Sequence, residues 1–574
     1  MRNENLNRLT VTELELFDKL ARAYAELDIP ILMADYATQR GGILSEFVTS
    51  GGKAFIAGGS NGQQFFPNVP QYTLPHDAFN DRTISLAKEI AKCFPKGIVR
   101  DKFATFNYAP VGDMLWARSV QEQVGGTLVA TSEQNFREYF EEKANLTDIL
   151  IGAGLSKHII PSKVIRNNKP LTAIQSEFLY SSLADEQGRI VIQECGEGNT
   201  EQGGGHSTEI ATSLEEFQEI VTRQRPCYLK VSQFISGSNS NLSICAGNTV
   251  PSSTMLGATK GALLPEESRF TPEALTTLKQ RAEEMGIDES NIVVNVQPGT
   301  LKVVGDSELT SSPTNGVGNQ LNYNFKPEIM DEIYDIGHKL GTFMALRGKV
   351  GMCGLDLIIT KDGQVYINEL NDRQQGPTES ASLNNEAHGL PGIHREAFLL
   401  NYANLKNPEV ASYLTEMSER SREIYEASSR IPSPFYIKVC ALQDCYSKVD
   451  LSAGDYSVSK DGAGGYTWDL SEDKGLEDMP QVDISEDETI VRINTVSATR
   501  GDFVPEGSQF LRINGVADSE TAPFTINEDG NSVLAEDWVD PIRALYQETL
   551  AQSLTTVMAV KPDVSQVADV AIQP

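Results

Sequence analysis

One short stretch, residues 354–373, constrains the fold more than any other part of this 574-residue chain. It reads GLDLIITKDGQVYINELNDR, and Asp362-Gly363 at its centre is a strong signal for a two-residue turn, because both residues tolerate positive φ. The flanking segments 355–360 and 365–370 are rich in β-branched and apolar residues. The stretch therefore predicts two antiparallel strands joined by a tight turn.

This predicted hairpin brings two carboxylates together. With a two-residue turn, Asp356 stands directly opposite Glu369 on one face, where like charges destabilise a sheet. Asn371 points the same way by the two-residue repeat of a strand, and its partner Gly354 leaves room above it. Two carboxylates and an amide oxygen are hard ligands that suit Mg²⁺, which also takes waters and phosphate oxygens. The hairpin therefore predicts a metal site at Asp356, Glu369 and Asn371.

Two other interpretations of the hairpin stay open at this point. It can be an edge hairpin whose polar face meets water. Its loop can also be longer than two residues, which would change the register of the strands and separate the two carboxylates.

Charge and cysteine content narrow the class of protein. The net charge of −31 argues against a nucleic-acid or anionic membrane surface, since both require basic patches. The seven cysteines are scattered without a C-x-x-C pair, which indicates free thiols, and Cys353 beside the hairpin is expected to be a buried thiol. There is no signal-peptide core at the start and no long apolar run. We expect a cytoplasmic protein.

Three domains are expected, and the predicted fold class is α/β and α+β multidomain. Residues 1–142 alternate helical patterns with short strands, which favours an α/β domain. Residues 143–430 mix helices and strands in an α+β arrangement, and within them the polar segment 309–324 is expected to be a mobile or ligand-covering loop. Residues 431–574 predict a β-rich domain with a closing helix at 537–554 and a loose tail.

The expected elements of the first two domains follow from periodicity. Helices are expected at 10–27, 82–94, 132–143, 146–155, 213–225 and 326–346. Strands are expected at 29–37, 53–59, 126–132, 189–195, 227–235 and 241–247.

Three features of the second domain follow one another in chain order. The first is a strand followed by a glycine loop, Gly203-Gly204-Gly205, and the second is a pair of strands within 228–246 joined by a short polar turn. The third is the hairpin, which ends in the pattern Glu369-x-Asn371-x-Arg373. In this order the features resemble the ATP-grasp superfamily of carboxylate–amine ligases, which includes D-alanine–D-alanine ligase and biotin carboxylase.

This resemblance, over about residues 143–400, implies a set of site residues. ATP would lie between two α+β subdomains under the mobile glycine loop. Asp356, Glu369 and Asn371 would bind two Mg²⁺ ions, with Glu369 bridging them, and Arg373 would meet the γ-phosphate or acyl-phosphate oxygens. The other positions implied to contact ATP are Lys143, Gln193, Gly203, Gly204, Gly205, Ser232, Gln233, Phe234, Ile235, Asn239 and Asn241. The segment from Ser232 to Ile235 would give backbone hydrogen bonds to adenine.

Some of these positions depart from the family's pattern. The family usually has a lysine at the position of Gln193, a glutamate at that of Ser232, and an acidic ribose contact near Asn239 or Asn241. Lys143 matches an earlier family lysine, its rivals are Lys157 and Lys163, and Lys260 is a further candidate for a phosphate contact. The neutral Gln193 leaves open which lysine contacts the phosphates and whether turnover is retained.

The resemblance implies an enzyme that activates a carboxylate as an acyl phosphate and joins it to an amine, releasing ADP and phosphate. The substrates would be amino acids, peptides or another small carboxylate, and the chain would form a homodimer. Residues bordering the acceptor pocket by position are Gln374, Gln375, Thr378 and Glu379. The alternatives are a ligase that activates bicarbonate or formate, a nucleotide-binding protein with a degenerate site, and a structural protein whose acidic segments bind a partner.

Overall fold

The computed structural model of the chain describes residues 2–553 with gaps. The gaps are residues 36–41, 59–67, 74–103, 107–126, 130–131, 133, 167–170, 196–207, 224–227, 252–261, 268, 404–406, 451–453, 462–464, 471–479, 497–498 and 519. The chain divides into two compact units. The first contains residues 1–302, 321–432 and 526–532, and the second contains 303–320, 433–525 and 533–574.

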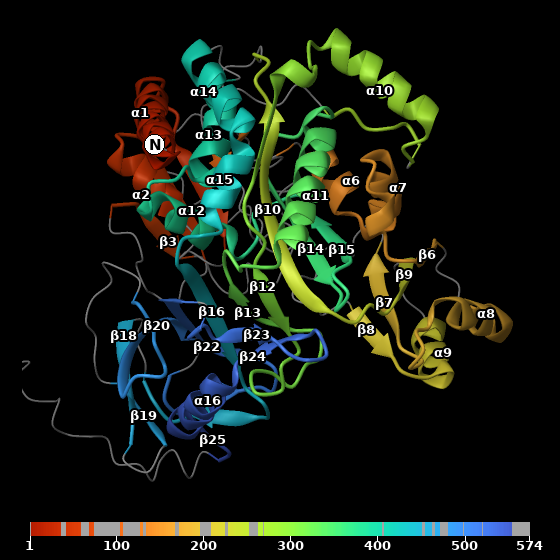
Figure 1. Cartoon of the computed structure of the whole chain (residues 1–574), viewed down its shortest axis with the longest axis vertical. Helices are drawn as coiled ribbons and strands as arrows, with labels where there is room; N and C mark the ends of the chain where they lie inside the picture. Colours follow the sequence, from red (N-terminus) through yellow and green to blue (C-terminus); the bar gives the residue numbers. More distant parts are fainter. Residues whose placement is uncertain are drawn as a thin grey trace, which may run out of the picture. The chain divides into compact units, whose positions relative to one another are not determined.

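The first unit begins with a parallel five-stranded sheet in the order β3-β2-β1-β4-β5. Its elements are α1 (Arg2–Glu26), β1 (Ile31–Asp35), α2 (Gly42–Thr49), β2 (Ala54–Gly58), β3 (Gln71–Thr73), β4 (Ala104–Phe106), β5 (Thr127–Val129) and α6 (Gln134–Glu141). The α1 helix packs against α13 and α14 of the same unit (Figure 1). Leu20 and Phe17 of α1 join Phe398 of α13 in one apolar core.

A four-stranded antiparallel sheet follows in the first unit, in the order β6-β9-β7-β8. Its elements and those leading to it are η3 (Lys143–Asn145), α7 (Leu146–Gly152), η4 (Ser156–His158), β6 (Ser162–Ile165), α8 (Ala173–Leu183), β7 (Ile190–Cys195), β8 (Thr208–Ala211), α9 (Leu214–Thr222) and β9 (Tyr228–Gln233). We call this sheet with α8 and α9 the lid sheet. Its apolar face packs on the two helices.

The lid sheet leads into a larger antiparallel sheet, in which β14 lies between β10 and β15 and β10 also pairs with β11 and β12. The elements are β10 (Ser238–Asn248), α10 (Pro272–Glu284), η5 (Glu289–Asn291), β11 (Ile292–Val296), β12 (Leu301–Val304), α11 (Pro327–Ala345), β14 (Gly351–Ile359), β15 (Val365–Asn371), α12 (Thr378–Ala387), α13 (Ile393–Ala403), α14 (Pro408–Glu419) and α15 (Ser421–Ser428).

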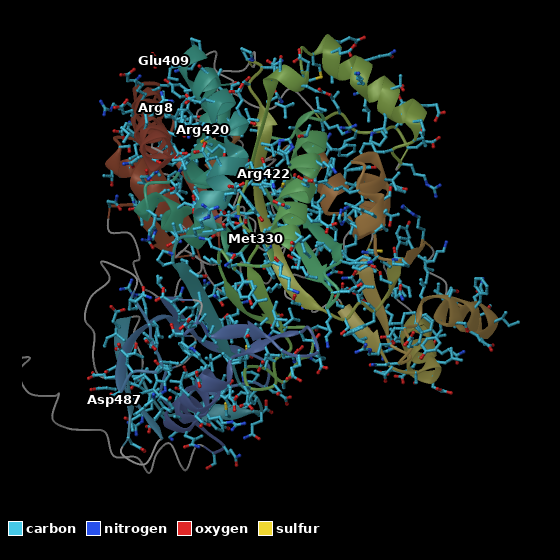
Figure 2. All side chains as sticks on the ribbon, in the orientation of Figure 1. Arg8, Met330, Glu409, Arg420, Arg422 and Asp487 are labelled. Atoms are coloured by element: carbon cyan, nitrogen blue, oxygen red, sulfur yellow. The ribbon has the colours of Figure 1, made fainter. Side chains whose placement is uncertain are left out.

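Helices cover both faces of this sheet. Gly337 and Gly341 let α11 approach closely, because a Cβ at either position would come within 2.7 Å of Val296 or Val294. On the opposite face α13 packs on β10 and β14. Arg422 of α15, labelled in Figure 2, makes ion pairs with Asp331 and Asp335 of α11.

The second unit contains an antiparallel sheet in the order β13-β16-β22-β20-β18-β19. Its elements are β13 (Gly316–Gln320), β16 (Ser433–Cys440), β17 (Cys445–Ser447), β18 (Gly454–Lys460), β19 (Tyr466–Asp469), β20 (Glu488–Val496), β21 (Phe503–Val504), β22 (Gln509–Ala517), α16 (Glu536–Thr549) and β25 (Leu550–Ala551). The short strands β23 (Phe524–Ile526) and β24 (Ser532–Leu534) pair with each other. Trp538 of α16 is fully buried and packs edge-on against Phe435 of β16.

The expected fold class is confirmed, since the structure combines a parallel α/β sheet with antiparallel α+β sheets. The polar segment 309–324 was expected to be a loop, but it contains β13. The α8 helix was not expected, because Ile174 and Phe178 point to solvent and leave no apolar stripe in the sequence. The helix expected at 82–94, the glycine loop at 203–205 and Lys260 lie outside the described residues.

No helix among the described residues is long and apolar enough to span a membrane.

A buried ion pair anchors the end of the hairpin. Lys349 and Asp372 are both fully buried, and the Lys349 Nζ lies 2.5 Å from the Asp372 Oδ1. The same ammonium donates to the Met352 carbonyl at 2.6 Å. Asp372 stands between Asn371 and Arg373 in sequence, so this pair fixes the backbone from which those two side chains project.

We expect Lys349→Met to lower the free energy of unfolding by about 3–5 kcal/mol, because it leaves the Asp372 carboxylate buried without its partner. Chemical denaturation monitored by circular dichroism measures this loss. Lys361→Met, at an exposed position in the hairpin loop, serves as the matched control. Equal stability of the two variants would show that the buried pair does not hold this strand.

Candidate active site

The two carboxylates of the hairpin lie opposite each other, as the sequence predicts. Asp356 of β14 is the cross-strand partner of Glu369 of β15, and Gly354 is the partner of Asn371. The side chains of Asp356 and Glu369 are 16% and 28% exposed, so both are largely shielded from water. The hairpin therefore holds two acidic groups together in a mostly dry position.

The turn that joins these strands is one residue longer than expected. Thr360 donates its backbone N–H to the Gln364 carbonyl at 2.9 Å, which leaves a three-residue loop in which Gly363 has a φ of +87°. This loop alone would shift the register by one residue and turn Glu369 to the other face. A bulge at Asn368, between the Asp356–Glu369 and Leu357–Ile367 pairs, restores the register.

The neighbouring strand β10 extends the row of polar side chains. Asn241 is the cross-strand partner of Asp356, and its Nδ2 donates to the Asp356 Oδ1. Gln375 donates to the same oxygen at 2.9 Å. The space expected above Gly354 is filled by this glutamine, since a Cβ on Gly354 would come within 2.2 Å of the Gln375 Cδ.

Two lysines form ion pairs with the carboxylates. The Lys302 Nζ of β12 is 2.8 Å from the Asp356 Oδ2, and the Lys143 Nζ of η3 is 3.7 Å from the Glu369 Oε1. The positive charges of Lys230 and Arg373 also act on Glu369. We call Lys143, Lys230, Lys302 and Arg373 the cation ring.

The cation ring controls the ionisation of Glu369. Burial raises the pKa of this carboxyl, but the charges of Lys143, Arg373, Lys302 and Lys230, in that order of strength, outweigh burial and hold the pKa below its usual value. Glu369 is therefore ionised at neutral pH. An ionised carboxylate is the form that binds a cation.

Arg373 hydrogen bonds to the side-chain oxygen of Asn371, the predicted amide ligand. Its Nη2 donates to the Asn371 Oδ1 at 2.7 Å, and its Nε lies 3.5 Å from the Glu141 Oε1. Arg373 and Asn371 therefore lie in contact at the end of the carboxylate row.

The other residues predicted to contact ATP fall on the lid sheet and β10. Gln193 of β7 is buried, with its Nε2 3.5 Å from the Thr208 Oγ1. The Ser232 hydroxyl is buried and has no hydrogen-bond partner within the described residues. Ser232 to Ile235 lie at the end of β9 and in the connection to β10, and the Arg189 guanidinium lies over the Phe234 ring at 4.0 Å from its centroid.

The structure places some of the remaining residues predicted to contact ATP, and others lie outside the described residues. The Gln233 backbone N–H donates to the Pro161 carbonyl at 2.9 Å, so it is already occupied and is not a free donor for adenine. Asn241 contacts Asp356, and Asn239 lies two residues away, next to Lys302 on β12. Gly203, Gly204 and Gly205 lie outside the described residues.

The rival lysines do not reach the carboxylates. Lys157 pairs with Glu332 at 2.8 Å, and Lys163 is exposed on β6. Sequence reasoning missed Lys230 and Lys302 as members of the site. A lysine in the middle of the apolar segment 227–235 was the available signal for Lys230.

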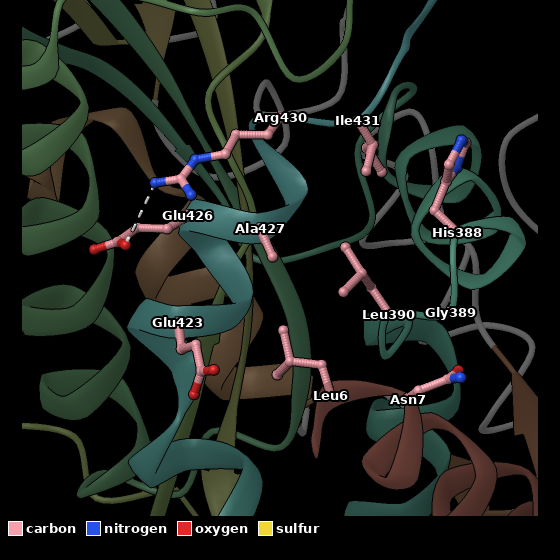
Figure 3. Close-up of a pocket in the computed structure, with 10 residues that line it drawn as sticks. All are labelled: Leu6, Asn7, His388, Gly389, Leu390, Glu423, Glu426, Ala427, Arg430 and Ile431. Atoms are coloured by element: carbon pink, nitrogen blue, oxygen red, sulfur yellow. Dashed lines mark ion pairs between the residues drawn. The ribbon is translucent and has the colours of Figure 1, made fainter. Parts of the chain in front are cut away.

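Two further features of the first unit lie away from this chemistry. Cys353 is buried, and burial raises the pKa of its thiol to about 12, so it is an inert thiol as expected. A pocket lined by α1, the loop after α12, and α15 includes Leu6, His388 and Arg430 (Figure 3). Asp356, Glu369 and Asn371 do not line this pocket.

Glu369→Gln tests the cation ring without any ligand. The folded-state pKa of Glu369 is lowered, so its stabilising effect is present above the unfolded-state pKa and is lost as pH falls through the folded-state pKa. We expect the variant to be less stable than the wild type at pH 7 and equally stable once the wild-type carboxyl is protonated. Urea denaturation across an acid pH series measures both arms, and a pH-independent difference would contradict the assignment.

No protein-family model matches the sequence, and no curated protein matches it either. An L-amino acid ligase from Bacillus licheniformis is 12% identical, covers 92% of this chain and 99% of its own, and has a TM-score of 0.48.

Two further solved structures have similar values. The biotin carboxylase domain of the Hydrogenobacter thermophilus 2-oxoglutarate carboxylase is 11% identical, with coverages of 85% and 86% and a TM-score of 0.48. A carboxyaminoimidazole ribonucleotide synthase from Aspergillus clavatus, complexed with ATP, is 10% identical, with coverages of 85% and 93% and a TM-score of 0.45.

Proposed function

We propose that this protein is an ATP- and Mg²⁺-dependent ligase that activates a carboxylate as an acyl phosphate and joins it to an amine. The observation that carries the proposal is the paired Asp356 and Glu369, enclosed by the four residues of the cation ring. Such a pair costs stability unless cations compensate it. The compensation comes from separate segments, which a structural hairpin would not require.

The residues present fit Mg²⁺. Two carboxylates with an amide oxygen nearby match the donor set of Mg²⁺, which takes one or two carboxylates and keeps the rest of its shell for waters and phosphate oxygens. The Lys302 Nζ lies 2.8 Å from the Asp356 Oδ2 and the Lys143 Nζ lies 3.7 Å from the Glu369 Oε1, which supports a role for these oxygens in binding cations. Asp356, Glu369 and Asn371 would hold two ions, with Glu369 shared.

The bound metal would neutralise phosphate charge and draw electron density from the γ-phosphorus. Lys143, Lys302 and Arg373 would then be free to turn from the carboxylates to phosphate oxygens. The planar guanidinium of Arg373 suits two oxygens of one phosphoryl group. Positioning and charge neutralisation carry most of the catalysis in phosphoryl transfer.

The proposed reaction has two steps. An oxygen of the substrate carboxylate bonds to the γ-phosphorus, and the bond to the bridging oxygen breaks to release ADP. The amine nitrogen then attacks the acyl carbon, phosphate leaves and the nitrogen loses a proton, which gives an amide.

Several residues that follow Arg373, and that are predicted to border the acceptor pocket, already make hydrogen bonds to other parts of the chain. The Gln374 Nε2 lies 2.5 Å from the His394 Nε2, and the Thr378 Oγ1 lies 2.9 Å from the Ser243 Oγ, with all four groups buried. The Glu379 Oε1 accepts from the Gly42 backbone N–H at 3.0 Å. We propose that Gln375 and Glu379 orient the substrate.

The test is ADP release from Mg²⁺–ATP with a mixed pool of amino acids, with mass spectrometry of the products. We expect ADP, phosphate and a new mass equal to two pool members less one water. Glu369→Gln should lower the rate roughly 100-fold or more, since it removes a charge from the reacting centre. Glu409→Gln, in an exposed pair with Lys19, is the matched control and should leave the rate unchanged.

The outcomes separate the rival functions. ADP release that requires bicarbonate or formate instead of the pool would assign the alternative ligase chemistry. Thermal stabilisation by Mg²⁺–ATP without ADP on any of these substrates would favour a nucleotide-binding protein. Full activity in Glu369→Gln would remove this residue from the proposed metal site.

A further inference from the structure

The lid sheet has one apolar face and one polar face. Ile190 and Ile192 of β7 and Leu229 and Val231 of β9 belong to the core beneath α8 and α9. Side chains alternate along a strand, so the residues between them point to the other face. The face away from the helices therefore carries a different set of side chains, which the helices do not cover.

Gln193 and Lys230 lie next to each other on this second face. They are cross-strand partners in the β7–β9 ladder, and such partners have Cβ atoms about 4.5–5.5 Å apart. The two residues are only 4% and 3% exposed. The neutral side chain at the position where the family places a lysine thus has a buried lysine as its direct neighbour.

The Lys230 ammonium is buried close to other charged groups. Across the part of the chain that the structure describes, no hydrogen bond or ion pair joins it to another residue. The charges that act on it most are those of Lys143, which repels it, and Glu369, which attracts it. A buried ammonium that makes no hydrogen bond or close ion pair within the described residues is costly, and an anion supplied by a ligand would offset that cost.

The charges around Lys230 favour such an anion. The cation ring carries four positive charges against the two carboxylates Asp356 and Glu369. Including the Arg137–Glu141 ion pair beside Arg373, and Glu142, which also acts on Lys230, leaves five positive charges against four negative ones. A chain with a net charge of −31 thus holds a local positive excess at one place. An anion that carries several charges is the ligand that this excess attracts.

We propose that Lys230 is the buried lysine that binds the phosphate oxygens of the nucleotide, delivered from β9 in place of a lysine at Gln193. The inference rests on the proposed function and names the residue that performs its phosphate contact. The flexible four-carbon stem of a lysine reaches the same space from either of two opposing positions. The lysine thus stands on β9 instead of the neighbouring strand β7, on the same face of the lid sheet.

The test measures binding of Mg²⁺–ATP, adenosine and tripolyphosphate to the full chain by calorimetry. We expect Lys230→Gln to weaken Mg²⁺–ATP and tripolyphosphate roughly 10- to 100-fold, the effect of losing a charge-assisted hydrogen bond, and to leave adenosine binding unchanged. The exchange variant Gln193→Lys with Lys230→Gln should recover most of the affinity. Lys163→Gln, an exposed lysine on the adjacent strand β6, is the control and should bind like the wild type.

Thermal unfolding separates a binding role from a structural one. Lys230→Gln removes both the desolvation cost of a buried charge and its attraction to Glu369, so its melting temperature should stay close to that of the wild type. A lower melting temperature together with unchanged Mg²⁺–ATP affinity would assign Lys230 to folding and overturn the inference. Failure of the exchange variant to recover affinity, with that variant folded, would also overturn it.

The two proposals fail in different ways. An Mg²⁺–ATP affinity that is the same in the wild type and in Lys230→Gln would overturn the inference and leave the proposed function standing. If the wild type binds tripolyphosphate more tightly than Lys230→Gln does but does not bind Mg²⁺–ATP, the phosphate contact is supported and the proposed function is overturned. Wild-type protein that binds neither would overturn both.

Discussion

The repulsion between Asp356 and Glu369 is the constraint on which the rest of the site depends. Adjacent strands hold these carboxylates together in a position shielded from water, where their mutual repulsion is poorly screened. Lys302 from β12 and Lys143 from η3 lie on their oxygens, and the charge of Lys230 from β9 acts on Glu369. The lid sheet and the larger sheet are thus linked electrostatically through one pair of acids.

The backbone of the hairpin is arranged to preserve this pair. A three-residue loop would place Glu369 on the far face of the strand, and the bulge at Asn368 reverses that shift. Bulges are frequent beside active sites because they aim a side chain without changing the rest of the ladder. The buried pair of Lys349 and Asp372 then fixes the chain immediately after the bulged strand.

The local positive charge of the cation ring would favour a polyanion at the proposed site, although the chain as a whole is acidic. The charge of the whole chain favours solubility, and it repels anions at long range. Within about one Debye length the cation ring outweighs this repulsion, and burial reduces screening by salt there. The proposed selectivity for phosphates would therefore come from the meeting of these four side chains, because the net charge of the whole chain opposes anion binding.

The sequence alone determined the contacts that are local in the chain. It predicted the opposed carboxylates and the pattern ending in Arg373, because a hairpin pairs residues that are close in sequence. Its error of one residue in the turn left no trace in that pairing, since the bulge cancelled it. The inert character of Cys353 was also foreseen from its apolar neighbours.

Only the tertiary structure decided which cations surround the acids. Asn241 and Asp356 are partners across 115 positions of sequence, and Lys302 is 54 positions from the acid it contacts. Strand order and register set these neighbours, and a single sequence carries no local signal for either. For the same reason the sequence showed Gln193 as a missing charge, while the fold places Lys230 beside it on the same face.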